Sequence, residues 1–321
     1  MTTETDLVLR SRRVLTDDGV RDAVVRVRGG RIVSIDAPAS APDAQDLGDL
    51  VLMAGLVDTH VHINDPGRTA WEGFATATAA AASGGVTTLV DMPLNSAPVT
   101  TSAHALDAKL RTADDEPLRV DVGFWGGAIP GNAEALGDLT RTGALGAKAF
   151  LCHSGIDEFP ASDEDALLSS MRALESVDRP LLLHAELERT SDLDRAALAA
   201  LPVDDYRVWL ESRPPSYEEA AIAMALQAAR RTGCAVHVVH LSAGSAVPLL
   251  RRAKEEGLPV TVETCPHYLV LTAEEVGRPV QVRAPHPRGR EPRSALGRSP
   301  RRHHRLHRLR PLAVYRGPQV R

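Results

Sequence analysis

Histidines at four positions end short apolar segments of the kind that form buried β-strands. His60 and His62 occur in DTHVHIND, His184 ends LLLH, and His240 ends AVHVVH. Residues i and i+2 of a strand point to the same side, so both imidazoles of the first pair can face one metal ion. The alternative is one inward histidine held by a backbone group, and His184 or His240 alone fits a core residue equally well. Together, the four predict a metal site built from three strands.

Lys148 ends another such segment, GAKAF, and is one of only three lysines in the chain, with Lys109 and Lys254. Burial of an ammonium is costly and lowers the pKa of a lysine. One outcome is a lysine whose amine reaches the surface. The other is a neutral amine that captures carbon dioxide, giving a carbamate whose two oxygens bridge two metal ions. The residue pattern leaves both open.

Other residues that could bind metal are predicted to be structural. His237 precedes His240 by three residues on the same strand and should face a different side. Cys152, Cys234 and Cys265 are too few and too scattered for a disulfide framework or a CxxC metal site. Cys152 and Cys265 could line a pocket, but packing as small apolar side chains is the simpler interpretation.

The elements that position these residues alternate along the chain from residue 51 onward. Seven short apolar segments are separated by Ala-rich stretches with helical periodicity, which predicts a parallel α/β sheet with crossover helices. Seven strands are one short of a closed (β/α)8 barrel, whose active site lies at the carboxyl ends of its strands. Residues 4–50 alternate with period two around the Gly29–Gly30 pair, which predicts a small antiparallel β unit.

Composition limits the classes of protein. The 321 residues are 43% hydrophobic and 25% charged, which suits a chain with a sizeable core. No apolar run approaches the roughly 20 residues needed to span a membrane, and the first ten residues do not form a signal peptide. We expect a cytoplasmic protein without a membrane partner.

Several motifs, in order along residues 5–276, resemble the cyclic amidohydrolases of the amidohydrolase superfamily, and among them the allantoinases. They are GLVDTHVHINDPGRTAWEGF, GGVTTLVDMPLNS, DVGFWGG, GAKAFLCHSG, LLLHAE and VETCPHYL. The resemblance implies a TIM-like (β/α)8 barrel with a small N-terminal β subdomain. We therefore expect a β subdomain over 1–52 and the barrel, strands one to seven, over 53–276.

The resemblance also implies a centre with two divalent metal ions. His60 and His62 would hold one ion, His184 and His240 the other, and a carbamate on Lys148 would bridge them. Zinc is the first choice, and iron, manganese and cobalt also suit these ligands. A hydroxide held between the ions would attack a ring carbonyl.

Details within the motifs favour allantoin, hydrolysed to allantoate, as the substrate. Dihydroorotases have a motif like HxHxR here, in which the arginine binds a substrate carboxylate. This chain has Asn64 at the position of that arginine, and a neutral substrate such as allantoin needs no cation there. DMPLNS differs from the DMPN of hydantoinases and dihydroorotases. Asn95 and Ser154 are the expected substrate contacts, although Asn95 fits a turn-former equally well. A hydantoinase or dihydropyrimidinase is the alternative, and full-length relatives are expected to form homo-oligomers.

The last segment, 277–321, departs from the family. It carries thirteen arginines, no lysine and one acid, a net charge of +12. The family would continue with an eighth strand and a motif like SDHSP, whose aspartate binds metal and acts as general base; the chain has no such motif. A nucleic-acid arm and a His-rich metal tract are alternatives, but arginine without interleaved aromatics or a folded module is weak support for either.

A reading-frame shift explains the segment better. Codons for HRLHRLRPL, residues 304–312, can be chosen so that a displacement of one base gives IDCIVSDH. The same displacement turns Val280 to Arg283 into FKC, which the family has there. We infer a frameshift near residues 276–280. The chain would then lack its eighth strand and general base, so it is expected to be inactive as written or a non-catalytic metal-binding remnant.

Overall fold

The computed structural model describes residues 7–42, 44–189, 196, 201 and 206–271. The predicted tail, 277–321, and the predicted loss of the eighth strand lie outside these residues. By contacts, the described chain separates into two units, whereas the sequence placed a boundary at residue 52. The first unit extends to Val57 and includes Gly85–Thr87, and the second comprises the remaining residues.

The first unit is a small β-sheet, as predicted. Strands β1 (Leu7–Thr16), β2 (Gly19–Arg28) and β3 (Arg31–Asp36) pair antiparallel in chain order. Gly29 and Gly30 join β2 to β3 with φ of 58° and 68°, the positive values that a two-residue type I′ turn requires. The sequence did not predict that β4 (Gln45–Asp46) and β5 (Val51–Leu52) would pair parallel with β1.

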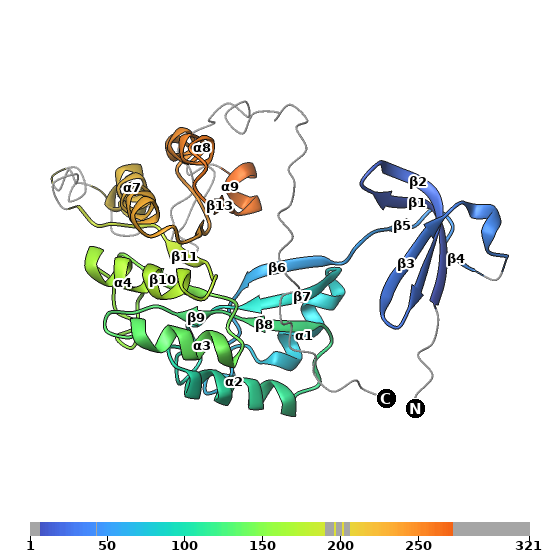
Figure 1. The fold of residues 1–321 in the computed structure, drawn as a ribbon, viewed down its shortest axis with the longest axis horizontal. Helices are drawn as coiled ribbons and strands as arrows, with labels where there is room; N and C mark the ends of the chain where they lie inside the picture. Colours follow the sequence, from blue (N-terminus) through green and yellow to red (C-terminus); the bar gives the residue numbers. More distant parts are fainter. Residues whose placement is uncertain (1–6, 43, 190–195, 197–200, 202–205, 272–321) are drawn as a thin grey trace. The chain divides into compact units, whose positions relative to one another are not determined.

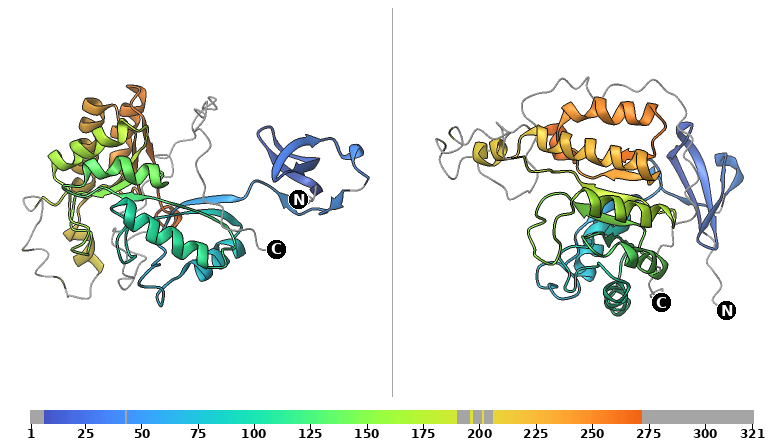
Figure 2. Two further views of the ribbon diagram at one scale, coloured as in Figure 1. Left: turned by 60° about the horizontal axis from the view of Figure 1, so that its bottom comes forward. Right: turned by 60° about the vertical axis from the view of Figure 1, so that its left-hand side comes forward.

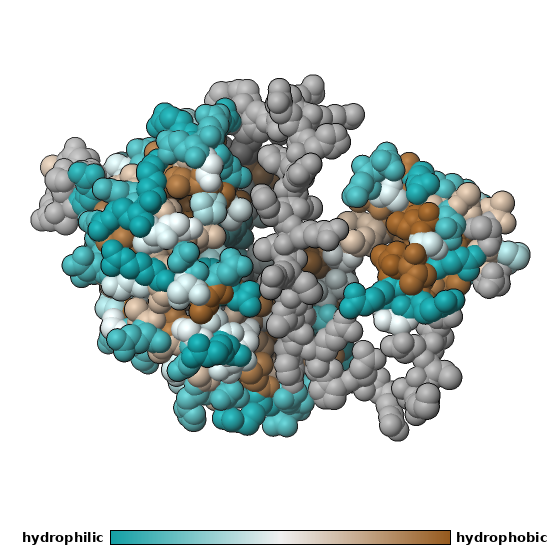
Figure 3. All heavy atoms as spheres, viewed as in Figure 1, coloured by the Kyte–Doolittle hydropathy of each residue, from teal (hydrophilic) through white to brown (hydrophobic). Residues whose placement is uncertain are grey.

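Some apolar side chains of this sheet form a buried cluster, and many of the others are exposed. Val14, Ala23 and Val25 form its buried cluster. Val20 and Ile32, in contrast, are 57% and 62% exposed. Figure 3 shows apolar residues gathered on the visible face of this unit. A single small sheet therefore buries only part of its apolar surface.

The second unit contains the predicted strand–helix alternation. Its strands are β6 (Leu56–Val61, which begins in the first unit), β7 (Val86–Asp91), β8 (Asp121–Phe124), β9 (Gly126–Gly127), β10 (Ala147–Phe150), β11 (Leu181–His184), β12 (Val236–Val238) and β13 (Val260–Val262). They form a three-stranded sheet ordered β6-β7-β8 and a five-stranded sheet ordered β13-β12-β11-β10-β9. The β7–β8 pair and every neighbouring pair of the five-stranded sheet are parallel.

The seven predicted strands appear as eight because the third is divided. Its first part, β8, pairs with β7, and its second part, β9, pairs with β10. Trp125 lies between the two parts and donates from its indole nitrogen to the carbonyl of Thr59, at 2.9 Å. One chain segment thus joins the two sheets.

Helices follow the strands and lie outside them (Figures 1 and 2). They are α1 (Phe74–Ser83), α2 (Ala103–Asp115), α3 (Leu136–Thr142), α4 (Glu164–Glu175), α6 (Tyr206–Ser212), α7 (Pro215–Thr232), α8 (Val247–Glu255) and α9 (Pro266–Val270). Helix α4 contacts β11, α7 contacts β12, and α8 contacts β13. None of the helices in the described ranges is long and apolar enough to cross a membrane.

Local chemistry explains where these helices begin and end. Ser102 and Asp163 accept hydrogen bonds from backbone N–H groups in the first turns of α2 and α4, at 3.2 and 2.8 Å. Helix α7 begins at Pro215 and is followed by Gly233, whose φ of 78° ends it in the left-handed region. The helices predicted from the Ala-rich stretches near 74–83 and 217–232 are confirmed.

A buried ion pair holds the chain just after His62 in place. Lys109 of α2 donates to a carboxylate oxygen of Asp91 at 2.6 Å, and the two side chains are 1% and 0% exposed. The other carboxylate oxygen of Asp91 accepts the backbone N–H of Ile63 at 2.7 Å. The pair therefore connects α2, the end of β7 and the segment beside the first two histidines.

Replacement of Lys109 should destabilise the protein strongly. In Lys109→Met the Asp91 carboxylate stays buried without its cation, and breaking such a pair costs about 3–5 kcal/mol in free energy of unfolding. Urea denaturation measures the loss. Lys254→Met, which alters an exposed lysine, should change stability by less than about 0.5 kcal/mol. Equal losses in the two variants would contradict the role of the pair.

Candidate metal centre

The predicted histidines and Lys148 meet at the carboxyl ends of the parallel strands. His60 lies in β6, Lys148 in β10, and His184 is the last residue of β11. His240 follows β12 by two residues. Parallel strands bring their carboxyl ends to one edge of a sheet, so residues far apart in sequence come together there.

The imidazole rings form a connected group. The ring centroids of His60 and His240 are 5.4 Å apart, and those of His184 and His240 are 4.7 Å apart. His62 joins through His60, at 5.6 Å between centroids, and is more exposed than the other three. The structure thus brings together all four histidines predicted from the sequence.

Lys148 is buried inside this group. Its side chain is 1% exposed, and its Nζ lies 3.4 Å from Nε2 of His60. The amine also lies 5.0 Å from the centroid of the Phe150 ring. Burial lowers the pKa of Lys148 to about 7, so a large fraction of the amine is neutral near physiological pH. The surface-reaching lysine that the sequence left open is therefore excluded.

The second pair of histidines is set by strand register and an unusual backbone conformation. Phe150 lies opposite His184 in the β10–β11 pair, and their rings stack at 4.7 Å. Nδ1 of His184 lies 3.0 Å from Nε2 of His240. His240 has φ of 42°, a left-handed conformation that costs energy in residues other than glycine and often marks functional sites.

The segment after His240 is fixed by a partly buried acid. Glu218 of α7 accepts backbone N–H groups of Ser242 and Ala243, the latter at 2.6 Å. This contact holds the turn in which His240 adopts its positive φ. Sequence reasoning did not identify Glu218, because a glutamate in a helical stretch resembles an exposed residue.

Two carboxylates border the histidines and were also missed. Glu263, just after β13, lies 2.5 Å from Nδ1 of His60. Glu186 lies 3.1 Å from Nε2 of His184 and 3.2 Å from Nε of Arg213. The sequence offered one signal for them, because each lies in a motif that carries the family resemblance, VETCPHYL for Glu263 and LLLHAE for Glu186.

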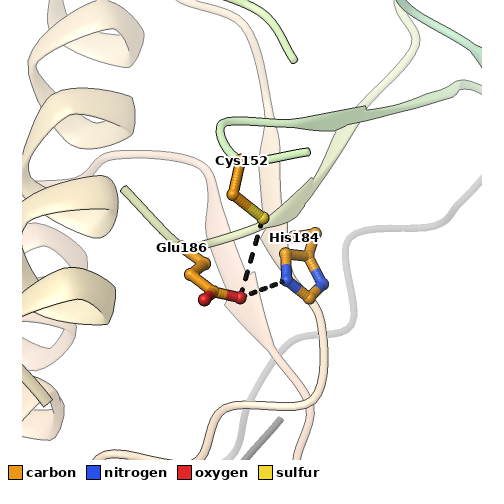
Figure 4. A group of neighbouring side chains, drawn as sticks. All are labelled: Cys152, His184 and Glu186. Carbon is orange, nitrogen blue, oxygen red and sulfur yellow. Dashed lines mark hydrogen bonds and ion pairs between the residues drawn. The ribbon is translucent and has the colours of Figure 1, made fainter. Parts of the chain in front are cut away.

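Cys152 lies close to this border. Figure 4 shows its sulfur near Glu186, which also contacts His184, and the Sγ–Oε2 distance is 3.6 Å. The three side chains place one possible ligand atom each within 4.8 Å of one another. Burial and the Glu186 carboxylate raise the pKa of Cys152 to about 12, so the thiol stays protonated. Its packing beside Phe150 and Phe159 agrees with the predicted apolar role.

The other residues singled out from the sequence, Ser154, Asn95, Asn64 and His237, differ in burial and in hydrogen bonding. Ser154 is buried and donates to the carbonyl of Phe159 at 2.6 Å, so its hydroxyl is already engaged. Asn95 is partly buried with φ of 73°, as a turn-former would be. Asn64 is 3% exposed, and its side-chain oxygen has no hydrogen-bond partner among the described residues. His237 contacts Thr261 at 2.8 Å and shares Glu263 with His60.

The donor set fits divalent metal ions. Burial lowers the pKa of His60 and, further, that of His240, so both imidazoles are neutral and can offer a lone pair. Imidazole nitrogens are ligands that zinc and iron accept. Nδ1 of His184 faces Nε2 of His240, and the rings of His60 and His62 form a second neighbouring pair.

Comparison with known proteins identifies the family of the chain. The model of the amidohydrolase family matches residues 51–286. The chain is 52% identical to an allantoinase of Streptomyces avermitilis over 281 residues, which are 85% of this chain and 61% of that protein. It is 44% identical to an allantoinase of Arabidopsis thaliana, covering 84% of this chain and 56% of that protein.

A solved structure shows the same fold. The L-hydantoinase (dihydropyrimidinase) of Arthrobacter aurescens superposes with a TM-score of 0.74 at 29% identity, covering 84% of this chain and 60% of that one. The chain thus spans about three fifths of the length of the relatives it matches. The fold shared with the hydantoinases is the TIM barrel that the sequence predicted.

Proposed function

The chain belongs to the amidohydrolase family, and we propose that its centre is that of an enzyme which hydrolyses the cyclic amide of allantoin to allantoate. The observation that carries the proposal is the buried Lys148 amine, 3.4 Å from His60, whose ring belongs to a connected group of four histidines. A buried amine with this neighbourhood suits a bridging ligand better than a structural lysine, which normally has a carboxylate partner, as Lys109 has in Asp91.

Each side chain has a proposed role. His60 and His62 would hold one ion, and His184 and His240 the other. The neutral amine of Lys148 would take up carbon dioxide, forming an N–C bond and releasing one proton, and the resulting carbamate would supply oxygen ligands. Bound divalent ions supply a water of lowered pKa and polarise a carbonyl oxygen. Zinc is the proposed metal, and iron, manganese and cobalt are the alternatives.

Several observations favour allantoin over other cyclic amides. The relatives named allantoinase are 52% and 44% identical to the chain, whereas the hydantoinase structure is 29% identical. Asn64 places a neutral amide where a carboxylate-bearing substrate would need a cation. Asn95 is the proposed substrate contact, and Ser154 is a weaker candidate because Phe159 accepts its hydroxyl. The substrate is a small molecule, and full-length relatives are proposed to be homo-oligomers.

The chain as written is proposed to lack turnover. Its sequence has no SDHSP-like segment, so the aspartate expected to act as general base is missing. A positioned general base contributes about 10²–10⁴-fold to a rate. A non-catalytic metal-binding chain is therefore the second candidate function for this polypeptide.

Removal of the Lys148 amine should weaken metal binding. Lys148→Met keeps an apolar stem of similar length but cannot form a carbamate. We expect zinc affinity, measured by chelator competition, to fall by at least about tenfold, and the carbamate signal of ¹³C-bicarbonate-labelled protein to disappear. Lys254→Met, at an exposed position, serves as control. Unchanged affinity together with no carbamate signal in the wild type would refute the bridge.

Restoring the reading frame should restore activity. The gene is altered by one base near codons 276–280, and the resulting protein is compared with the 321-residue chain. We expect allantoin turnover from the restored protein, and at least about 100-fold less from the 321-residue chain. Equal turnover would show that the missing aspartate is unnecessary. Faster turnover of hydantoin or dihydrouracil than of allantoin by the restored protein would favour the hydantoinase alternative.

A further inference from the structure

We propose that Glu263 and Glu186 are positioning residues that fix which ring nitrogen His60 and His184 present to the metal centre. The proposal rests on the proposed metal-binding role of these histidines. It adds two carboxylates whose contacts with His60 and His184 would act through the imidazoles. The two contacts impose opposite tautomers on the two histidines, which makes the proposal testable.

Glu263 is held rigidly between two histidines. One of its carboxylate oxygens lies 2.5 Å from Nδ1 of His60, and the other lies 3.3 Å from Nε2 of His237. Its backbone is fixed as well, because its N–H donates to Val238 at 3.0 Å and its carbonyl accepts from Leu241 at 2.8 Å. The two bonds reach the chain on either side of His240, at Val238 before it and at Leu241 after it.

This contact determines the state of His60. A carboxylate only accepts hydrogen bonds, so a neutral His60 must carry its proton on Nδ1 to donate to Glu263. Nε2 then keeps its lone pair, and it is Nε2 that lies 3.4 Å from Nζ of Lys148. Glu263 therefore directs the metal-binding nitrogen of His60 toward the bridge.

Glu186 imposes the reverse arrangement on His184. Its Oε2 lies 3.1 Å from Nε2 of His184, while Oε1 accepts from Nε of Arg213 at 3.2 Å. The neutral ring must therefore carry its proton on Nε2. Nδ1 keeps its lone pair and faces Nε2 of His240 at 3.0 Å. The guanidinium of Arg213 holds the carboxylate in the orientation that this bond requires.

Carboxylates that bond the outer nitrogen of a metal-binding histidine fix its tautomer and orientation, and loss of such a partner typically costs about 10–100-fold in metal affinity. Here each carboxylate contacts one ring nitrogen and leaves the other nitrogen of the same ring facing Lys148 or His240. His60 and His184 would otherwise populate both tautomers and several ring angles.

The test reads the tautomers directly. Metal-free protein with ¹⁵N-labelled histidine is examined by NMR, and the signals of His60 and His184 are assigned by their loss in His60→Asn and His184→Asn. We expect a proton on Nδ1 of His60 and on Nε2 of His184. In Glu263→Gln and Glu186→Gln, the corresponding ring alone should shift to a mixture of tautomers.

Zinc affinity provides the second readout. Chelator competition should show about 10–100-fold weaker binding for each Gln variant, and Glu263→Asp should recover part of the loss for His60. Glu256→Gln is the matched control, since Glu256 pairs with Arg230 at the surface and touches no histidine. Circular dichroism confirms that each variant is folded. If the glutamine amides still order the imidazole rings, Glu263→Leu and Glu186→Leu remove the hydrogen-bond acceptor entirely.

The outcomes separate this proposal from the proposed function. Wild-type tautomers that differ from the expected pair, or rings unaffected in both the Gln and Leu variants, would overturn the positioning role whatever the metal affinity. Failure of wild-type protein to bind zinc would instead contradict the metal centre, and the tautomer measurement would still decide whether the two carboxylates order the rings.

Discussion

Parallel pairing of β10 to β13 is the constraint on which the centre depends. Residue-by-residue register sets Phe150 opposite His184 and Leu182 opposite His237. Side chains at the ends of these strands therefore project from one edge, although helices and loops separate the strands in the sequence. Helices α4, α7 and α8 contact β11, β12 and β13 and keep the strands in this order.

Lys109 and Lys148 are both buried, but the cost of burying each amine is offset in a different way. Lys109 is matched by Asp91, and the pair connects a helix, a strand and the segment after His62. Lys148 is equally buried but hydrogen-bonds a histidine and lies near an aromatic ring. The first arrangement offsets the cost of burial with charge, and the second offsets it by favouring the neutral amine. Of these two lysines, only Lys148 places a neutral, nucleophilic nitrogen beside a histidine.

The centre is ordered by acids that lie outside it. Glu263 and Glu186 each contact one of the four histidines, and Glu218 contacts the backbone just after His240. Their hydrogen bonds join β6, β11 and α7 to the same group of imidazoles. Preorganisation of this kind removes much of the orientational freedom that ligands would otherwise lose when a metal binds.

By itself, the sequence determined the α/β class, the seven strand segments and the group of His60, His62, Lys148, His184 and His240, since period, strand-end position and motif spacing are local properties. Tertiary structure alone decided the split of the third strand at Trp125, the burial of Lys148 and the engagement of Ser154. It also decided that Glu263 bonds His60, 203 positions away in the chain. Hydrogen bonds between distant segments depend on how sheets and helices pack, which no local pattern of residues encodes.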